Sequence, residues 1–184
     1  MHKVLIIFFI LNLYSPVFSS IKEKIVAQMK LTNNLSFNFI QTIDNKNENG
    51  KCIIKYPKKI WCKYDNSIKK IIVSNGKSLV IKTANKGSYY LYPLSKTPLN
   101  ILLDKNYLIS KIKTLEAREI DGKYLNFKFF DNNNEINIFF DIKSLNLIGW
   151  QTEDIYQNLV ITFISSVKIN QKINNKIFFL PKNN

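Results

Sequence analysis

The sequence predicts a mainly β protein with helices (α+β), built on one strongly curved antiparallel sheet or barrel. About ten short segments alternate apolar and polar residues with a period of two, as half-buried strands do. Tight-turn sequences separate these segments, and Asn75-Gly76 is a strong hairpin signal. Two helical segments, at 21–30 and 97–104, remain to cover the concave apolar face of an incompletely closed sheet.

The first half of the chain begins with a helical pattern and continues with strands. Residues 21–30 place their apolar side chains on one helical stripe, and alternation then predicts a strand around 35–39. The polar residues 44–50 predict a loop. After a cysteine-containing hairpin, further strands are predicted at 71–73, 79–81 and 88–92.

The segment 97–104 interrupts the series of strands. Thr97 suits a helix N-cap, and Pro98 suits the first helical position. Apolar residues cover most of the helix circumference, so this helix is either buried or in contact with an apolar ligand. Strands are then predicted at 114–120, 124–130, 136–142, 147–153 and 159–169, with a short C-terminal strand at 177–181.

The two cysteines flank a turn sequence centred on Pro57. A hairpin with this centre pairs residue 54 with 60, and Cys52 with Cys62, on one face of the sheet. The two sulfurs would then form a disulfide in an oxidising compartment. Two buried free thiols are the alternative, because a one-residue slip in register would separate the pair.

Residues 1–19 have the pattern of a cleaved secretory signal peptide. Lys3 precedes an apolar run from Val4 to Leu13, and small residues follow at Ser19 and Ser20. The run is shorter than the roughly twenty apolar residues that span a bilayer, although an uncleaved anchor is the alternative. We expect residues 20–184 to form a single exported domain.

The composition favours a binding or carrier protein over an enzyme. The 184 residues are 46% hydrophobic and 13% aromatic, which is enough for one domain with a core. The single histidine, His2, lies in the predicted leader, so no histidine remains for a catalytic triad or a metal cluster. We expect no catalytic residue, no metal site and no cofactor.

The formal net charge of +14 is carried almost entirely by lysine, since Arg118 is the only arginine among 27 basic residues. Recognition of phosphates and base edges usually recruits the bidentate fork of arginine. A solvated lysine surface is the simpler interpretation, and we expect no nucleic-acid partner. A polyanion site and a weak attraction to anionic membranes are the alternatives.

Large apolar side chains gather on the predicted inner face of the sheet. They form either a close-packed core or a cavity that shields lipid tails from water. The cavity candidates are Phe37, Phe39, Ile54, Ile60, Tyr64, Ile72, Tyr89, Leu91, Phe127, Phe129, Ile138, Phe140 and Trp150. The candidate lid residues are Leu99, Ile101, Leu102 and Leu103.

Five motifs carry a family resemblance: residues 37–42 (FNFIQT), the hairpin 50–64, residues 71–79 around the Asn-Gly turn, residues 92–99 (YPLSKTPL) and residues 147–154 (LIGWQTED). In this order they resemble the LolA family of outer-membrane lipoprotein carriers.

The resemblance implies an unclosed β-barrel with an α-helical lid, in which the hairpin 52–64 and the segment 97–104 border a lipid site. It also implies a monomeric periplasmic carrier of acylated lipoproteins, which takes its cargo from an inner-membrane ABC lipoprotein-releasing complex. Delivery is to the outer membrane, with or without an acceptor protein there. Tyr56 stands where the family often has arginine, which puts a polar latch to the lid in doubt. An exported LolA-like domain that senses lipids or lipoproteins, without carrier activity, is the alternative.

Overall fold

The computed structural model describes residues 20–182 except 85–86, 132–133 and 155–156. The signal peptide predicted for residues 1–19 lies outside the described residues. Within the described part of the chain, no helix combines the length and hydropathy that crossing a membrane requires.

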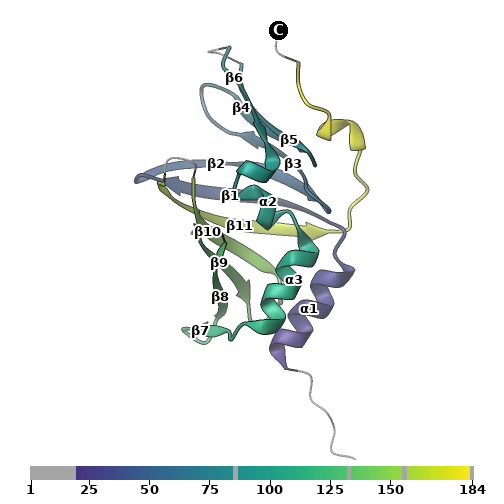
Figure 1. The fold of residues 1–184 in the computed structure, drawn as a ribbon, viewed down its shortest axis with the longest axis vertical. Coiled ribbons are helices and arrows are strands. Elements are labelled where there is room, and N and C mark those ends of the chain that lie inside the picture. Colours follow the sequence, from purple (N-terminus) through teal and green to yellow (C-terminus); the bar gives the residue numbers. More distant parts are fainter. Residues whose placement is uncertain (1–19, 85–86, 132–133, 155–156, 183–184) are drawn as a thin grey trace, which may run out of the picture.

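The described residues form one antiparallel sheet of 11 strands, in the spatial order β6-β5-β4-β3-β2-β1-β11-β10-β9-β8-β7 (Figure 1). The strands β6 and β7 end this order without pairing to each other, so the curved sheet is not closed into a barrel, and the predicted fold class is confirmed. The strands are β1 (Asn34–Ile43), β2 (Lys46–Lys55), β3 (Lys59–Tyr64), β4 (Lys70–Asn75), β5 (Ser78–Thr83), β6 (Tyr89–Pro93), β7 (Arg118–Ile120), β8 (Tyr124–Asp131), β9 (Asn134–Asp141), β10 (Leu147–Glu153) and β11 (Leu159–Ile169).

Helices cover one face of this sheet (Figure 1). The helix α1 (Ile21–Leu31) starts at a capping box, in which Ser20 and Glu23 bond to each other's backbone N–H groups. It packs against α3 (Lys105–Thr114), and the short α2 (Leu99–Leu102) lies between α3 and the 3-10 helix η1 (Leu94–Lys96).

The helix α3 was absent from the sequence prediction, which expected a strand from residue 114 to 120. Asp104 caps the helix by accepting a hydrogen bond from the Tyr107 N–H, and Leu108, Ile109 and Ile112 bury one side of it. The helix therefore takes residues up to 114, and only Arg118–Ile120 remain as β7.

Two further predictions differ from the structure. The expected loop over 44–50 is reduced to a two-residue turn at Asp44 and Asn45, both with positive φ, and Lys46 already belongs to β2. The expected C-terminal strand over 177–181 is replaced by the 3-10 helix η2 (Asn175–Phe178), which contacts β3 and β4. Phe178 is buried there, so packing rather than strand pairing holds this segment.

The cysteine hairpin has the predicted register. Ile54 pairs with Ile60 and Cys52 pairs with Cys62, and a disulfide joins the two cysteines. Side chains alternate along β3, so Ile60 and Cys62 lie on the concave face of the sheet and Trp61 lies on the convex face.

Candidate functional site

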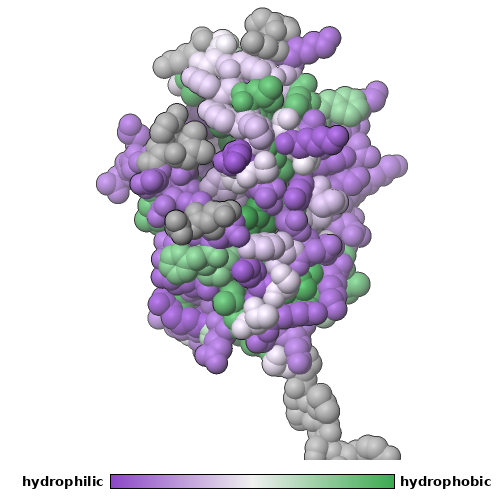
Figure 2. Space-filling model, viewed as in Figure 1, coloured by the Kyte–Doolittle hydropathy of each residue, from purple (hydrophilic) through white to green (hydrophobic). Residues whose placement is uncertain are grey.

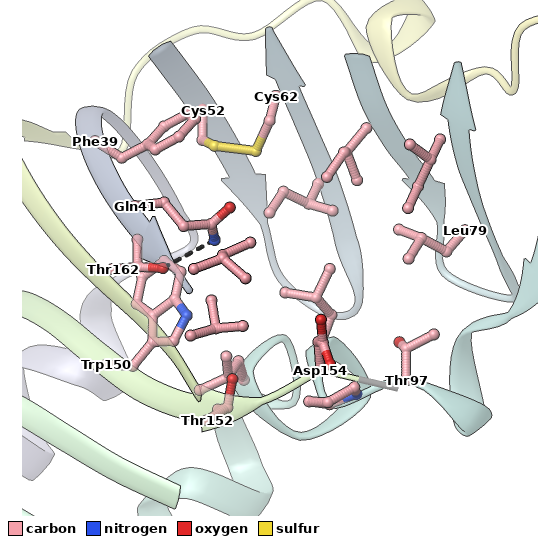
Figure 3. Close-up of a pocket in the computed structure, with 18 of the residues that line it drawn as sticks. Phe39, Gln41, Cys52, Cys62, Leu79, Thr97, Trp150, Thr152, Asp154 and Thr162 are labelled. Atoms are coloured by element: carbon pink, nitrogen blue, oxygen red, sulfur yellow. Dashed lines mark hydrogen bonds between the residues drawn. A yellow bond between two sulfur atoms is a disulfide. The ribbon is translucent and has the colours of Figure 1, made fainter. Parts of the chain in front are cut away.

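An apolar cavity of about 280 Å³ lies between the inner face of the sheet and α2 (Figure 3). Its volume is near the lower end of the roughly 300–1,000 Å³ typical of ligand pockets. Strands β1–β6, β10 and β11 supply the walls, and α2 with the residues just before it supplies the cover. The hollow part of the sheet therefore runs from β6 to β10 in the spatial order, and β9, β8 and β7 lie outside it.

Nine residues predicted for the site line this cavity. The wall contains five of the predicted cavity residues and both cysteines, and the cover contains two of the predicted lid residues: Phe39, Ile60, Tyr64, Ile72, Trp150, Cys52, Cys62, Leu99 and Leu102. The rings of Phe39 and Tyr64 pack edge to face, with centroids 4.8 Å apart.

The strand register arranges the wall in rows that become more polar toward one end. Cys52, Cys62 and Ile72 are neighbours in one row. The next row along contains Phe39 and Tyr64, opposite each other across Gly50. A Cβ atom at Gly50 would lie 2.2 Å from the Lys63 carbonyl oxygen, so this close approach requires glycine.

A hydrogen-bonded chain of polar groups follows beyond these rows. The Tyr64 hydroxyl donates to Gln41 Oε1 at 3.0 Å. Gln41 Nε2 in turn donates to Thr162 Oγ1 at 3.0 Å, the bond drawn dashed in Figure 3. Burial, and to a smaller extent the charge of Glu48, raise the pKa of Tyr64, so this phenol stays neutral. Lys70 lies 3.9 Å above the Tyr64 ring and forms an ion pair with Glu48.

The junction between α2 and α3, directly after the cover, is held to the cysteine hairpin by two polar contacts at one residue. The backbone N–H of Lys58 donates to the Leu103 carbonyl at 2.9 Å, and Lys58 Nζ lies 3.4 Å from Asp104 Oδ2. Tyr56 is packed against the core instead, and burial raises its pKa. The latch position is therefore two residues after Tyr56, and sequence reasoning missed it.

Six predicted cavity residues lie in close packing instead. Phe127 and Phe140 pack edge to face with centroids 5.9 Å apart, and Phe129 lies against Tyr107 of α3. Ile54 and Ile138 border a gap of only about 10 Å³ beside Leu103. Phe37 packs against Trp150, with ring centroids 6.2 Å apart. The physical reason is α3, which fills the concave side of β8 and β9.

The remaining predicted residues also lie away from the cavity. Tyr92 of β6 lines the cavity opposite Leu79, so Tyr89 and Leu91 have the parity of the opposite face, and Leu91 is 56% exposed. Leu103 is fully buried beside the packed part of the sheet. Ile101 lines a separate, polar surface pocket.

Sequence reasoning missed the polar part of the lining and the wall contributed by β5. Alternation along β1 places Gln41 and Ile43 on the face of Phe39, so the pattern itself contained that signal. The additional lining residues are Gln41, Ile43, Lys70, Leu79, Ile81, Tyr92, Thr97, Pro98, Thr152, Glu153, Asp154, Val160 and Thr162.

The side of the molecule that carries α1, α2 and α3 exposes little apolar surface (Figure 2). Figure 2 shows hydrophilic residues over most of this face, with hydrophobic residues in separate areas between them. Large apolar area is instead concentrated inside, in the cavity and the core. The structure thus defines a class: a curved, unclosed β-sheet with a helical cover over an apolar cavity.

A protein-family model matches most of this chain. The family described as outer membrane lipoprotein carrier protein LolA matches residues 30–180, and the chain belongs to this family. No curated protein matches the chain.

Three solved structures are similar to this one at low sequence identity. An uncharacterized conserved protein from Thermus thermophilus has 6% identity and a TM-score of 0.52, covering 88% of this chain and 93% of that one. A LolA superfamily protein from Nitrosomonas europaea has 10% identity and a TM-score of 0.45, covering 88% and 99%. A putative outer membrane lipoprotein-sorting protein domain from Vibrio parahaemolyticus has 7% identity and a TM-score of 0.48, covering 85% and 95%.

Proposed function

We propose that this protein is a periplasmic carrier that binds the acyl chains of lipoproteins in its cavity. It receives them from an inner-membrane ABC lipoprotein-releasing complex and delivers them to the outer membrane, acting as a monomer and without catalysing a reaction. The apolar cavity beneath α2 is the observation that carries this proposal. Membership of the LolA family supports it, and the Cys52–Cys62 disulfide fits an oxidising compartment.

The driving force is the removal of acyl chains from water. Each buried methylene contributes about 0.8 kcal/mol, so shape and apolar area suffice, and no directional chemistry is needed. Release requires an acceptor that offers similar burial, because transfer between two apolar environments is nearly neutral in free energy.

The cover must move to admit several chains, because the cavity holds only about 280 Å³. The helix α2 is only four residues long, and the latch at Lys58 consists of one backbone hydrogen bond and one partly exposed ion pair. Such an ion pair contributes on the order of 1 kcal/mol or less. Leu99 and Leu102 leave the cavity wall as the chains enter.

Native mass spectrometry with a synthetic triacylated lipopeptide tests the proposal. We expect a one-to-one complex with the lipopeptide, and no complex with the same peptide lacking acyl chains. Equal binding of both peptides, or of neither, contradicts the proposal.

A matched pair of variants locates the binding. Ile72→Glu places a carboxylate in the cavity wall, whereas Ile40→Glu makes the same change on the exposed outer face of β1. We expect Ile72→Glu to reduce lipopeptide binding more than tenfold, because burying a charge beside acyl chains is costly, and Ile40→Glu to leave it unchanged. Circular dichroism verifies that both variants are folded.

Transfer to vesicles separates a carrier from a sensing domain. A carrier passes bound lipopeptide to acceptor vesicles, whereas a LolA-like sensing domain without carrier activity retains it. Retention of the lipopeptide over hours contradicts the carrier role.

A further inference from the structure

The β10–β11 wall of the cavity presents two threonine hydroxyls with hydrogens to donate. Thr152 is 5% exposed and Thr162 is 2% exposed, and both line the cavity (Figure 3). Thr152 pairs with Val160 and Thr162 pairs with Trp150, so the two threonines are diagonal neighbours, about 7–8 Å apart. Both therefore lie on the same side of the cavity.

Neither hydroxyl donates to a protein group within the part of the chain that the structure describes. Thr162 Oγ1 accepts from Gln41 Nε2, so its own hydrogen is left to donate. The Thr152 hydroxyl makes no hydrogen bond to the described residues, and Figure 3 shows its oxygen directed into the cavity. Both hydroxyls thus depend on water or on a ligand for an acceptor.

An acyl chain at this level of the cavity would expel that water. A buried hydroxyl without a hydrogen-bond partner is unfavourable, so pure hydrocarbon is a poor match to this part of the wall. Hydrocarbon does match the rows at Cys62 and Ile72, and the underside of α2 at Leu102. The cavity is therefore divided into an apolar part and a part with hydrogen-bond donors.

We propose that Thr152 and Thr162 form a subsite for the ester carbonyl groups of a diacylglyceryl lipid, and so fix its orientation in the cavity. This inference rests on the proposed function and specifies the ligand chemistry of the same site. The acyl chains extend from the subsite toward the disulfide and α2. The glyceryl end and its attached chain point toward Glu153 and Asp154, where the lining is charged.

A comparison of ester and ether lipids tests the subsite. Dioctanoylglycerol and dioctylglycerol have the same chain length, but only the ester lipid has carbonyl acceptors. We expect the wild-type protein to bind the ester about tenfold more tightly, because its carbonyls accept two hydrogen bonds whose gain is partly offset by dehydration of the carbonyls.

Threonine-to-valine variants remove the donors with little change of shape. In the double variant Thr152→Val/Thr162→Val, the ester-to-ether ratio of dissociation constants should fall to about one, whereas Thr152→Ser should retain the preference. Thr42→Val, on the outer face of β1, is the matched control.

The outcomes separate this inference from the proposed function. A wild-type protein that binds both lipids equally, or a double variant that keeps the preference, overturns the carbonyl subsite alone. A protein that binds neither lipid overturns the proposed function, and the subsite with it.

Discussion

Two parts of the sheet keep their apolar inner face away from water in different ways. Strands β8 and β9 bury their aromatic inner face under α3, whose Leu108, Ile109 and Ile112 are themselves buried. Strands β1–β6, β10 and β11 surround a hollow, and a four-residue helix covers it. A long helix with its own buried stripe makes a core, whereas a short helix held by a few contacts makes the cover that opens in the proposed mechanism.

The largest expected effect concerns core packing. Phe127 is fully buried against Phe140 in the packed part of the sheet, so Phe127→Ala should lower the free energy of unfolding by about 3–5 kcal/mol. Ile72→Ala removes a partly exposed wall residue beside an existing hollow, so it should cost only about 1 kcal/mol. Chemical denaturation measures both values, and equal losses would remove the distinction between the two parts.

The disulfide should be next in size. Its sulfurs belong to residues that line the cavity wall. Removing it in Cys52→Ala/Cys62→Ala should cost about 3 kcal/mol, because the cross-link restricts the unfolded chain between the two cysteines. Denaturation with and without reductant checks this, because a reductant should destabilise the wild type and leave the variant unchanged.

The anchor of the fixed helix gives a smaller effect with a defined pH dependence. Tyr107 of α3 donates to Asp131 at 2.6 Å, and Tyr107→Phe should cost about 1–2 kcal/mol. Burial, followed by the hydrogen bond and charge of Asp131, raises the pKa of Tyr107 from 10 to about 12. A raised pKa in the folded state means that the contribution is complete below pH 10 and is lost as the pH rises through 12.

Urea denaturation from pH 8 to 11.5 would show this trend. The difference between wild type and Tyr107→Phe should be constant up to pH 10 and then shrink. A difference that grows with pH would contradict the assignment.

The ion pair between Lys58 and Asp104, the side-chain part of the latch, should have the smallest effect on the free energy of unfolding. Lys58→Met removes the ion pair to Asp104 but keeps the apolar stem of the side chain, so global stability should change by less than about 1 kcal/mol. Hydrogen exchange at residues 99–103 should instead accelerate several-fold, while exchange in α3 stays constant. Lys59→Met, on the neighbouring residue, is the control, and unchanged exchange at the cover would exclude Lys58 as a latch.

The strands were predictable where alternation and turn chemistry agreed. The hairpin around Pro57 and the strands on either side of Asn75-Gly76 follow the residue pattern directly. The polar residues from Lys46 to Asn49 belong to β2, although their composition predicts a loop. Backbone pairing with β1 across a two-residue turn holds them in the sheet, and the residue pattern carries no signal of that pairing.

The candidate site was less predictable than the fold, for two physical reasons. The helix α3 decides which aromatic residues are core, and its cap at Asp104 was not recognised as a helix start. On β6, a choice of parity by one residue placed Leu91 inward, whereas the register with β5 places Tyr92 there. Both features depend on tertiary contacts, the packing of α3 over β8 and β9 and the pairing of β6 with β5, which the sequence pattern does not contain.

Quenching of tryptophan fluorescence by a brominated lipid tests the central claim most directly. The chain has two tryptophans: Trp150 lines the cavity, and Trp61 lies on the outer face of β3. A lipopeptide with bromine on its acyl chains should quench Trp150 in the Trp61→Phe protein and leave Trp61 unquenched in the Trp150→Phe protein. Equal quenching of the two residues, or no quenching of Trp150, would contradict a lipid-filled cavity beneath α2.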